Sequence, residues 1–295
     1  MDGLKLDDQR PRFRIGLVSD THMPMRCREF PPALFEVMAD VDLLLHAGDV
    51  GELWVLDQLS AIAPVVAVHG NDDSVDAKRE LPFQQVVVAN GRRILLWHGH
   101  FPNWEDEAAA RRGDDLLPKL ARHTQQAKRS GASMVVFGHW HIPLVCQNEG
   151  VKVVNPGALA SGNEITRQLR QTAAILEVCS NGDMAITHFD LASPGEIHVP
   201  RIDWEGGFMA AWNQYSASIL GRDVAEEIPY LKAHLQPTEV DELRDLVLRL
   251  AHRVWQGEEE LITLPMLLDA LKEDEQIRPQ TREQVRALMA KRQGR

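Results

Sequence analysis

Two histidines follow an apolar run in the segment VVFGHWHIP, residues 135–143. The apolar residues have the composition of a buried strand, and Gly138 allows the backbone to turn directly after it. His139 and His141 then stand with one residue between them, a spacing that suits metal ligands when other ligands lie close by. The pair therefore predicts a metal site, on the condition that other strands deliver ligands to the same place.

Four earlier apolar runs end in residues of the same chemical kinds. The runs are FRIGLVS (13–19) before Asp20 and His22, VDLLLHA (41–47) before Asp49, PVVAVHG (64–70) before Asn71 and Asp72, and RRILLWHG (92–99) with His98 and then His100. Ligands collect outside the carboxyl ends of the strands in open α/β sheets, so five such ends predict one shared site. Carboxylate, imidazole and amide groups together suit a divalent transition metal better than an all-oxygen Ca²⁺ cage.

The elements that must position these residues change in character along the chain. Over residues 1–200, strand-like runs rich in Val, Ile and Leu alternate with helix-like segments, which predicts an α/β fold. Residues 201–295 lose these runs and have the pattern of helices. We therefore expect an α/β domain over 1–200 and a helical extension over 201–295.

The clearest helix of the extension is expected at 238–257, where Thr238 precedes an acidic residue by three positions, as in a capping box. Two shorter helices are expected at 264–275 and 278–290. The first helix carries one apolar stripe, made of Leu243, Leu246, Val247, Leu250 and Val254. This stripe leaves three roles open for the extension: association of two copies into a homo-oligomer, a cap over the site, or a stabilising pack.

Composition limits the class of protein. The 295 residues carry a formal net charge of −11, which argues against a general nucleic-acid binder. The three cysteines have no CxxC spacing and indicate free thiols, and Cys27, near the first motif, is expected to be a spectator. Neither a signal peptide nor an apolar run long enough for a membrane span is found, so we expect a cytoplasmic protein.

The order of the motifs, Asp-x-His, Gly-Asp, Gly-Asn, His and Gly-His-x-His, resembles the calcineurin-like metallophosphoesterase superfamily over roughly residues 13–190. Within it the chain is most similar to the compact bacterial and archaeal phosphodiesterases, because its segment Asn155–Ala158 (NPGA) resembles their NPGS loop. The resemblance implies a four-layer α/β/β/α sandwich, here with a C-terminal helical extension, and the activity of a metal-dependent phosphoesterase.

The resemblance also implies a dinuclear centre of divalent transition-metal ions, with Mn²⁺ favoured and Fe, Zn or Ni as alternatives. Asp20, His22 and His141 would hold one ion, Asn71, His98 and His139 would hold the other, and Asp49 would bridge the two. Two ions about 3.5–4 Å apart can hold a hydroxide for in-line attack on phosphorus. No GxSxG elbow or P-loop pattern offers a rival chemistry.

Two positions depart from the superfamily pattern. Many members read Gly-Asn-His where this chain has Gly-Asn-Asp, ending in Asp72, and that histidine is usually assigned to transition-state stabilisation or leaving-group protonation. A carboxylate cannot take a cationic role, so His100, just beyond His98, is our candidate for the acid. Trp140 replaces a small residue and is either an aromatic wall beside the metals or part of the local packing.

Several other residues have two interpretations. His46 and His69, at the ends of buried strands, are expected to be packed or supporting histidines rather than ligands. The segment 101–132 is either a lid, contributing Asn103, Trp104, Arg111 or Arg112 to substrate binding, or a solvated helix pair, which we favour.

The function that these patterns favour is hydrolysis of a small phosphodiester. The alternatives are a phosphomonoesterase acting on a nucleotide, sugar phosphate or phosphoprotein, and a protein-binding scaffold like the retromer subunit that shares this fold. A nuclease is disfavoured by the acidic balance. The complete set of seven ligand positions favours an enzyme, because a scaffold does not need them.

Overall fold

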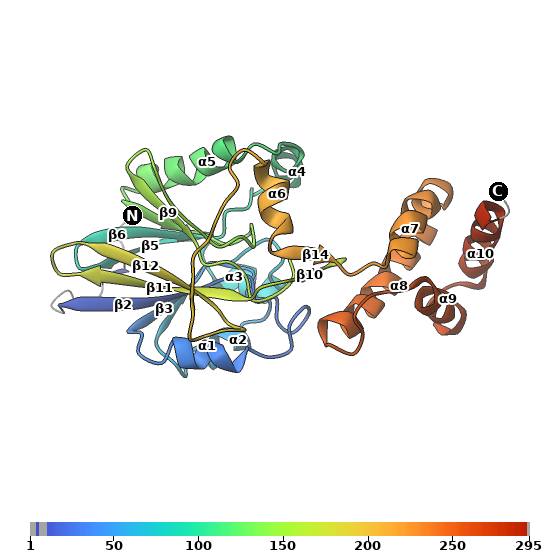
Figure 1. Ribbon diagram of the computed structural model, residues 1–295, viewed down its shortest axis with the longest axis horizontal. Coiled ribbons are helices and arrows are strands. Elements are labelled where there is room, and N and C mark those ends of the chain that lie inside the picture. The colour runs from blue at the N-terminus through green and yellow to red at the C-terminus, as the bar shows by residue number, and fades with distance from the viewer. Residues whose placement is uncertain (1–3, 6–10, 294–295) are drawn as a thin grey trace. The chain divides into compact units, whose positions relative to one another are not determined.

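The computed structural model describes residues 4–5 and 11–293 and divides into two compact units (Figure 1). The first unit holds the residues up to Gly162 together with Gln168–Ser216, and the second holds Asn163–Arg167 and the residues from Ala217 onward. Helix α6 (Gly207–Asn213) lies in the first unit, past residue 200, where the sequence pattern changes. None of the described helices is long and apolar enough to cross a membrane.

Two six-stranded sheets form the body of the first unit. One has the order β1 (Leu4–Lys5), β5 (Gln84–Ala89), β6 (Arg92–Trp97), β7 (Met134–Val136), β9 (Val151–Asn155) and β8 (Leu144–Asn148). The other has the order β13 (Ile197–His198), β12 (Met184–Asp190), β11 (Thr172–Cys179), β2 (Arg12–Val18), β3 (Leu43–His46) and β4 (Val65–Ala67). Strands β2, β3 and β4 are mutually parallel, and so are β6, β7 and β9.

The sheets pack face to face because successive apolar side chains of a strand point alternately into the core between the sheets and into a core on the outer side. On β2, Phe13, Ile15 and Leu17 enter the core between the sheets, where they meet residues of β6 and β11. On β6, Ile94 and Leu96 face this same inner core, whereas Leu95 and Trp97 face the opposite side. Both faces of each central strand are therefore buried, as the nearly continuous apolar runs predict.

Helices cover the outer face of each sheet (Figure 1). Helices α1 (Pro32–Val37) and α2 (Trp54–Leu59) pack with β2, β3 and β11, and α5 (Leu116–Arg129) packs with β6, β7 and β9. Two further helices, α3 (Val75–Glu80) and α4 (Trp104–Arg112), lie in connecting segments. The order helix, sheet, sheet, helix confirms the predicted four-layer sandwich.

The expectation of a solvated helix pair at 101–132 is wrong for α5. Leu116, Leu120 and Ala127 are buried and face the outer side of the first sheet. Their helical spacing gives α5 one apolar side, which serves as an outer layer of the sandwich.

The second unit contains α7 (Arg222–His234), α8 (Pro237–Trp255), α9 (Leu264–Glu273) and α10 (Pro279–Gln293) around their own core. The apolar stripe expected on α8 is buried in this core. The capping residue is not Thr238 but Gln236, whose backbone N–H donates to Glu239. The helix begins earlier because Pro237 has the fixed φ and missing N–H that suit a first helical position. Strands β10 (Thr166–Gln168) and β14 (Ser216–Ser218) form a two-stranded sheet.

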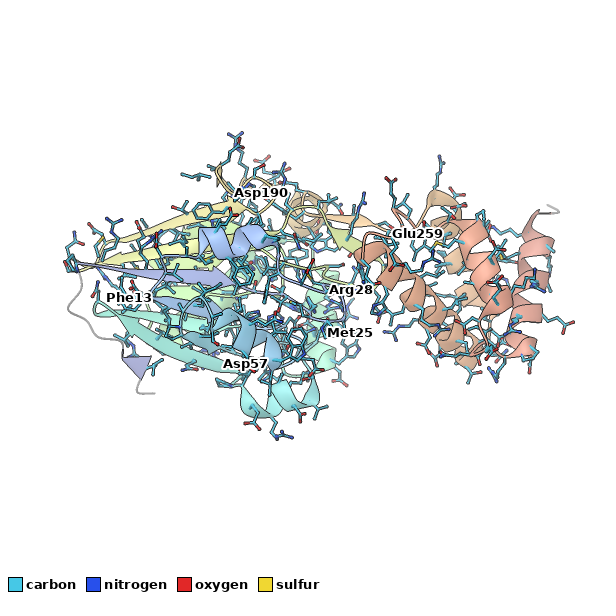
Figure 2. All side chains as sticks on the ribbon, turned by 90° about the horizontal axis from the view of Figure 1, so that it is seen from below. Phe13, Met25, Arg28, Asp57, Asp190 and Glu259 are labelled. Carbon is cyan, nitrogen blue, oxygen red and sulfur yellow. The ribbon has the colours of Figure 1, made fainter. Side chains whose placement is uncertain are left out.

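The strand directions bring the candidate ligands to one end of the sandwich. Figure 2 shows Phe13, near the start of β2, and Met25, in the loop after it, at opposite ends. The loops that follow β2 and β3 are joined by a hydrogen bond from the Asp20 N–H to the Gly48 carbonyl. The Gly138 N–H, after β7, likewise donates to the His98 carbonyl after β6.

We expect Leu96→Ala to lower the free energy of unfolding of the sandwich by about 2–5 kcal/mol, because it removes a fully buried side chain between the sheets. Leu117→Ala, on the exposed side of α5, should change it by less than about 0.5 kcal/mol. Urea denaturation checks both, with hydrogen–deuterium exchange of β6 and β7 assigning the transition to the sandwich. Equal shifts in the two variants would contradict this description of the core.

Candidate metal centre

The loops after the strands turn through an unusual backbone conformation. The φ angles of five candidate ligands are positive, at 55° for Asp20, 46° for His22, 52° for Asp49, 67° for His139 and 58° for His141. Residues other than glycine are uncommon in this region and cost free energy there, although Asp, Asn and His tolerate it best. Such strain gathered on five neighbouring polar residues is typical of a functional site.

Glycines beside the ligands allow the loops to approach each other. A Cβ at Gly138 would lie 2.7 Å from the Ala47 carbonyl oxygen and 2.8 Å from Oδ2 of Asp20. A Cβ at Gly70 would lie 2.0 Å from Oδ1 of Asp49. These two positions need glycine because the carboxylates occupy the space that a side chain would take.

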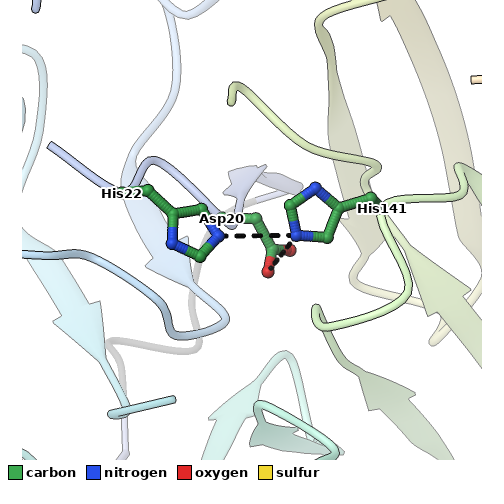
Figure 3. A group of neighbouring side chains, drawn as sticks. All are labelled: Asp20, His22 and His141. Atoms are coloured by element: carbon green, nitrogen blue, oxygen red, sulfur yellow. Dashed lines mark hydrogen bonds and ion pairs between the residues drawn. The ribbon is translucent and has the colours of Figure 1, made fainter. Parts of the chain in front are cut away.

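Asp20, His22 and His141 form the first group of ligand atoms (Figure 3). Nε2 of His141 is 3.2 Å from Oδ1 of Asp20 and 3.5 Å from Nε2 of His22. Two atoms that bind one transition-metal ion at about 2.0–2.2 Å are themselves about 3.0–3.6 Å apart. The observed separations fall within this interval, so the three side chains fit a shared ion.

The second group centres on Asp49 and His98. Nε2 of His98 is 3.2 Å from Oδ2 of Asp49 and 3.2 Å from Oδ1 of Asn71. The same Oδ2 of Asp49 lies 3.6 Å from Nε2 of His22, in the first group. Asp49 is thus the carboxylate that faces both groups, and its role as a bridging ligand stays a prediction.

The orientation of two rings supports metal binding. Nδ1 of His98 is 2.8 Å from the Ala47 carbonyl oxygen, and Nδ1 of His141 is 3.0 Å from that of Ala160. A carbonyl accepts only, so each Nδ1 carries a proton, and each Nε2 faces the carboxylates, where it can bind an ion in place of its own proton. Metal-binding histidines are typically oriented by such a hydrogen bond from the other ring nitrogen. The donor set therefore fits divalent transition metals.

Burial and neighbouring charges keep this cluster anionic. Burial raises the pKa of Asp20, but the charge and hydrogen bond of His141 outweigh it and lower the pKa to about 2. Burial lowers the pKa of His98, but the Asp49 carboxylate outweighs it and raises the pKa to about 10. For His22 burial prevails and lowers the pKa to about 4. Carboxylates that stay ionised in a buried cluster make it a binding place for cations.

His139 is placed beside the second group and makes a contact that the sequence does not indicate. Its ring lies 5.0 Å from that of His98, between centroids, but its Nε2 is 2.8 Å from Oε1 of Glu107. Its backbone N–H donates to the Asp20 carboxylate at 3.1 Å. The ligand role of His139 stays a prediction that involves its other ring nitrogen, Nδ1.

Asp72 faces the first group and is paired with a cation. Nη2 of Arg26 is 2.9 Å from Oδ2 of Asp72, and Nη1 of Arg26 is 3.0 Å from the Ser161 carbonyl oxygen. The backbone N–H of Asp72 donates to Oδ1 of Asp49 at 2.8 Å. A guanidinium thus lies where the sequence indicates only a carboxylate. No motif marks Arg26, although it follows His22 by four residues.

His100 is buried within reach of the centre. Its ring packs 5.1 Å from Phe83 and 5.3 Å from His98, between centroids, and its Nδ1 has no hydrogen-bond partner among the described residues. Burial, followed by the charge of His98, lowers its pKa to about 3. The role of general acid stays a prediction.

Trp140 belongs to the packing and not to a wall beside the metals. It is 7% exposed, and its ring meets His123 and Phe137 at 4.9 Å and Phe208 at 5.6 Å, between centroids. Its side chain therefore belongs to the core on the outer side of the first sheet, with Trp97 and Leu116.

The two remaining histidines have supporting positions. His46 is fully buried, and its Nε2 is 3.1 Å from the hydroxyl of Thr21, next to Asp20. His69 packs its ring 5.7 Å from Phe83 and 5.8 Å from His100, between centroids.

The segment 101–132 contacts the centre through Glu107, which no sequence motif marks. Asn103 caps α4 by accepting from the Asp106 N–H, and Trp104 is 71% exposed. Arg111 donates to Glu107, which in turn contacts His139. The acidic start of α4 has the composition of a solvated face, and no local pattern signals a contact with a residue so distant in sequence.

Comparisons with known proteins agree with this geometry. The sequence profile of the calcineurin-like phosphoesterase superfamily domain matches residues 13–181, and the chain belongs to this superfamily. A probable metallophosphoesterase of Methanocaldococcus jannaschii is 34% identical over 144 residues, which are 49% of this chain and 67% of that protein. One of Bacillus subtilis is 32% identical over 122 residues, 41% of this chain and 61% of that protein.

These relatives confirm the compact prokaryotic branch of the superfamily and support phosphoester hydrolysis as the class of activity. Among solved structures, vacuolar protein sorting 29 from Cryptosporidium parvum matches with a TM-score of 0.50 and 21% identity. The match covers 64% of this chain and 96% of that one. It is a likeness of fold.

We expect Gly138→Ala to disturb the centre, because its Cβ would press on the Ala47 carbonyl and the Asp20 carboxylate. The cost should be about 1–3 kcal/mol of unfolding free energy, with weaker Mn²⁺ binding. Thermal unfolding and calorimetric titration with Mn²⁺ measure the two effects. Gly195→Ala is the control, since nothing lies within 4 Å of a Cβ there. Wild-type Mn²⁺ affinity in Gly138→Ala would refute the described packing.

Proposed function

We propose that the protein is a phosphodiesterase that depends on two divalent transition-metal ions, preferably Mn²⁺. The observation that carries this proposal is the position of Asp49. Its Oδ2 faces Nε2 of His22 at 3.6 Å on one side and Nε2 of His98 at 3.2 Å on the other. A carboxylate buried between two imidazoles is suited to be shared by two ions.

When bound, such an ion pair activates water as a nucleophile and clamps the attacking and leaving oxygens of an in-line displacement. The residues of the chain supply the charge and the fixed geometry that such an ion pair needs. Asp20 and Asp49 supply negative charge, while the Ala47 and Ala160 carbonyls fix the rings of His98 and His141. This fixed arrangement reduces the reorganisation that substrate binding and catalysis require.

The charge of Asp72 favours a diester over a monoester. Its side chain is 35% exposed and lies next to the first ligand group. A phosphomonoester carries up to two negative charges near neutral pH, whereas a diester carries one, so the carboxylate repels a monoester more strongly. The pairing of Asp72 with Arg26 reduces this repulsion but leaves no net positive charge for a dianion.

We expect the purified protein to hydrolyse bis-p-nitrophenyl phosphate faster than p-nitrophenyl phosphate in the presence of Mn²⁺. Dialysis against EDTA should remove both activities, and added Mn²⁺ should restore them. His98→Gln should lower diester turnover by at least about tenfold, because it replaces a ring that faces Asp49 and Asn71. Absence of turnover of either ester with Mn²⁺, Fe²⁺, Zn²⁺ and Ni²⁺ would favour the scaffold alternative.

We expect Asp72→His to raise monoesterase activity relative to diesterase activity by several-fold. The variant removes the repelling carboxylate, frees Arg26 from its partner and adds a hydrogen-bond donor where phosphoryl charge develops. The ratio of kcat/KM for the two nitrophenyl esters measures the change. Asp76→His, with the same change of formal charge in a surface ion pair with Arg79, is the control. An unchanged ratio in Asp72→His would count against the role given to Asp72.

A further inference from the structure

One buried carboxylate reaches the centre from a helix instead of a strand end. Glu107 lies in α4, its side chain is only 7% exposed, and its Oε1 is 2.8 Å from Nε2 of His139. The superfamily motifs do not include this residue. Through Glu107, helix α4 contacts the predicted metal centre, and no superfamily motif accounts for this contact.

The Glu107 carboxylate is held in place from several directions. The backbone N–H of Phe101 donates to its Oε2 at 2.9 Å, and Nε of Arg111 donates to its Oε1 at 2.9 Å. The Arg111 guanidinium is itself half-exposed, so Glu107 lies at the inner end of this short chain of contacts. A side chain fixed in this way can fix the ring that it contacts.

The contact selects which nitrogen of His139 is protonated. An ionised carboxylate can only accept, so Nε2 of His139 carries a proton, and in the neutral ring Nδ1 keeps the unshared electron pair. The backbone N–H of His139 donates to the Asp20 carboxylate, which fixes the other end of the residue. Both the position and the tautomer of the ring are then determined.

His98 and His141 are arranged in the opposite sense. In each, Nδ1–H donates a hydrogen bond to a backbone carbonyl and Nε2 faces the centre. In His139, Nε2 instead makes the hydrogen bond to Glu107, so Nδ1 is the nitrogen that can bind an ion. A carboxylate partner also makes an imidazole a more basic ligand than a carbonyl partner does.

We propose that Glu107 is a positioning residue for His139, which holds the Nε2–H tautomer and presents Nδ1 to the second ion. This inference rests on the proposed two-ion function. It assigns to α4, in the segment 101–132, the task of completing the half of the centre formed by Asn71 and His98.

Metal titration of the full-length protein tests the assignment. We expect wild type to bind two Mn²⁺ ions, and Glu107→Ala to weaken one of them by about 10–100-fold while leaving the other unchanged. Glu107→Gln keeps an acceptor oxygen without the charge, so its loss should be smaller. Glu105→Ala, at an exposed position of the same helix, is the matched control and should bind as wild type does. Wild-type affinity for both ions in Glu107→Ala would overturn the proposal.

The tautomer of His139 provides a readout that does not need bound metal. Nitrogen-15 NMR of the ring, assigned with His139→Gln, should show the Nε2–H form in metal-free wild type and its loss in Glu107→Ala. If wild type binds fewer than two ions, the proposed function fails, and this spectrum still decides the role of Glu107. If the circular dichroism spectrum shows that Glu107→Ala does not fold as wild type does, the same measurement on Glu107→Gln decides the role of Glu107. An unchanged His139 tautomer in a folded variant would refute the assignment.

Discussion

The centre depends on the burial of the Asp49 carboxylate between the rings of His22 and His98. A buried charge is costly unless neighbouring groups balance it, and here the Asp72 N–H and the two imidazoles lie next to the carboxylate. Protons on the rings can provide part of the balance, as the raised pKa of His98 shows. A divalent cation balances the carboxylate better than ring protons do, because one central charge replaces several contacts that depend on protonation. The loops around Asp49 are therefore arranged for metal ions.

Holding that carboxylate in place imposes strain on the backbone. Asp49 itself has a φ of 52°, and its Oδ1 occupies the space beside Gly70 where a Cβ would stand. Such strain persists only where the surrounding structure fixes it, and the sandwich does so with parallel strands whose ends point the same way. The inner core of Ile, Leu and Val side chains stabilises the strands, and their loops carry the conformations that the ligands need.

Local patterns were sufficient to predict the α/β class and the strand ends that carry the candidate ligands, because apolar runs mark buried strands and polar residues directly after them must meet at one sheet edge. The four layers were implied by the family resemblance. Arg26 and Glu107 escaped prediction because their contacts are tertiary and their local surroundings resemble a solvated surface. Trp140 was ambiguous for a related reason, since the direction of its side chain depends on a loop conformation that the residue order does not specify.

The two halves of the centre consequently differ in what supports them. The group of Asp20, His22 and His141 is built from loops after β2 and β7. The Ala160 carbonyl orients the ring of His141, and Nδ1 of His22 contacts Arg26. The group of Asn71 and His98 gains its third candidate ligand, His139, only with a side chain from α4. A backbone carbonyl is always present at its position, whereas a glutamate can be lost by a single substitution or displaced with its helix. The support proposed for the second group therefore depends on a single side chain of α4.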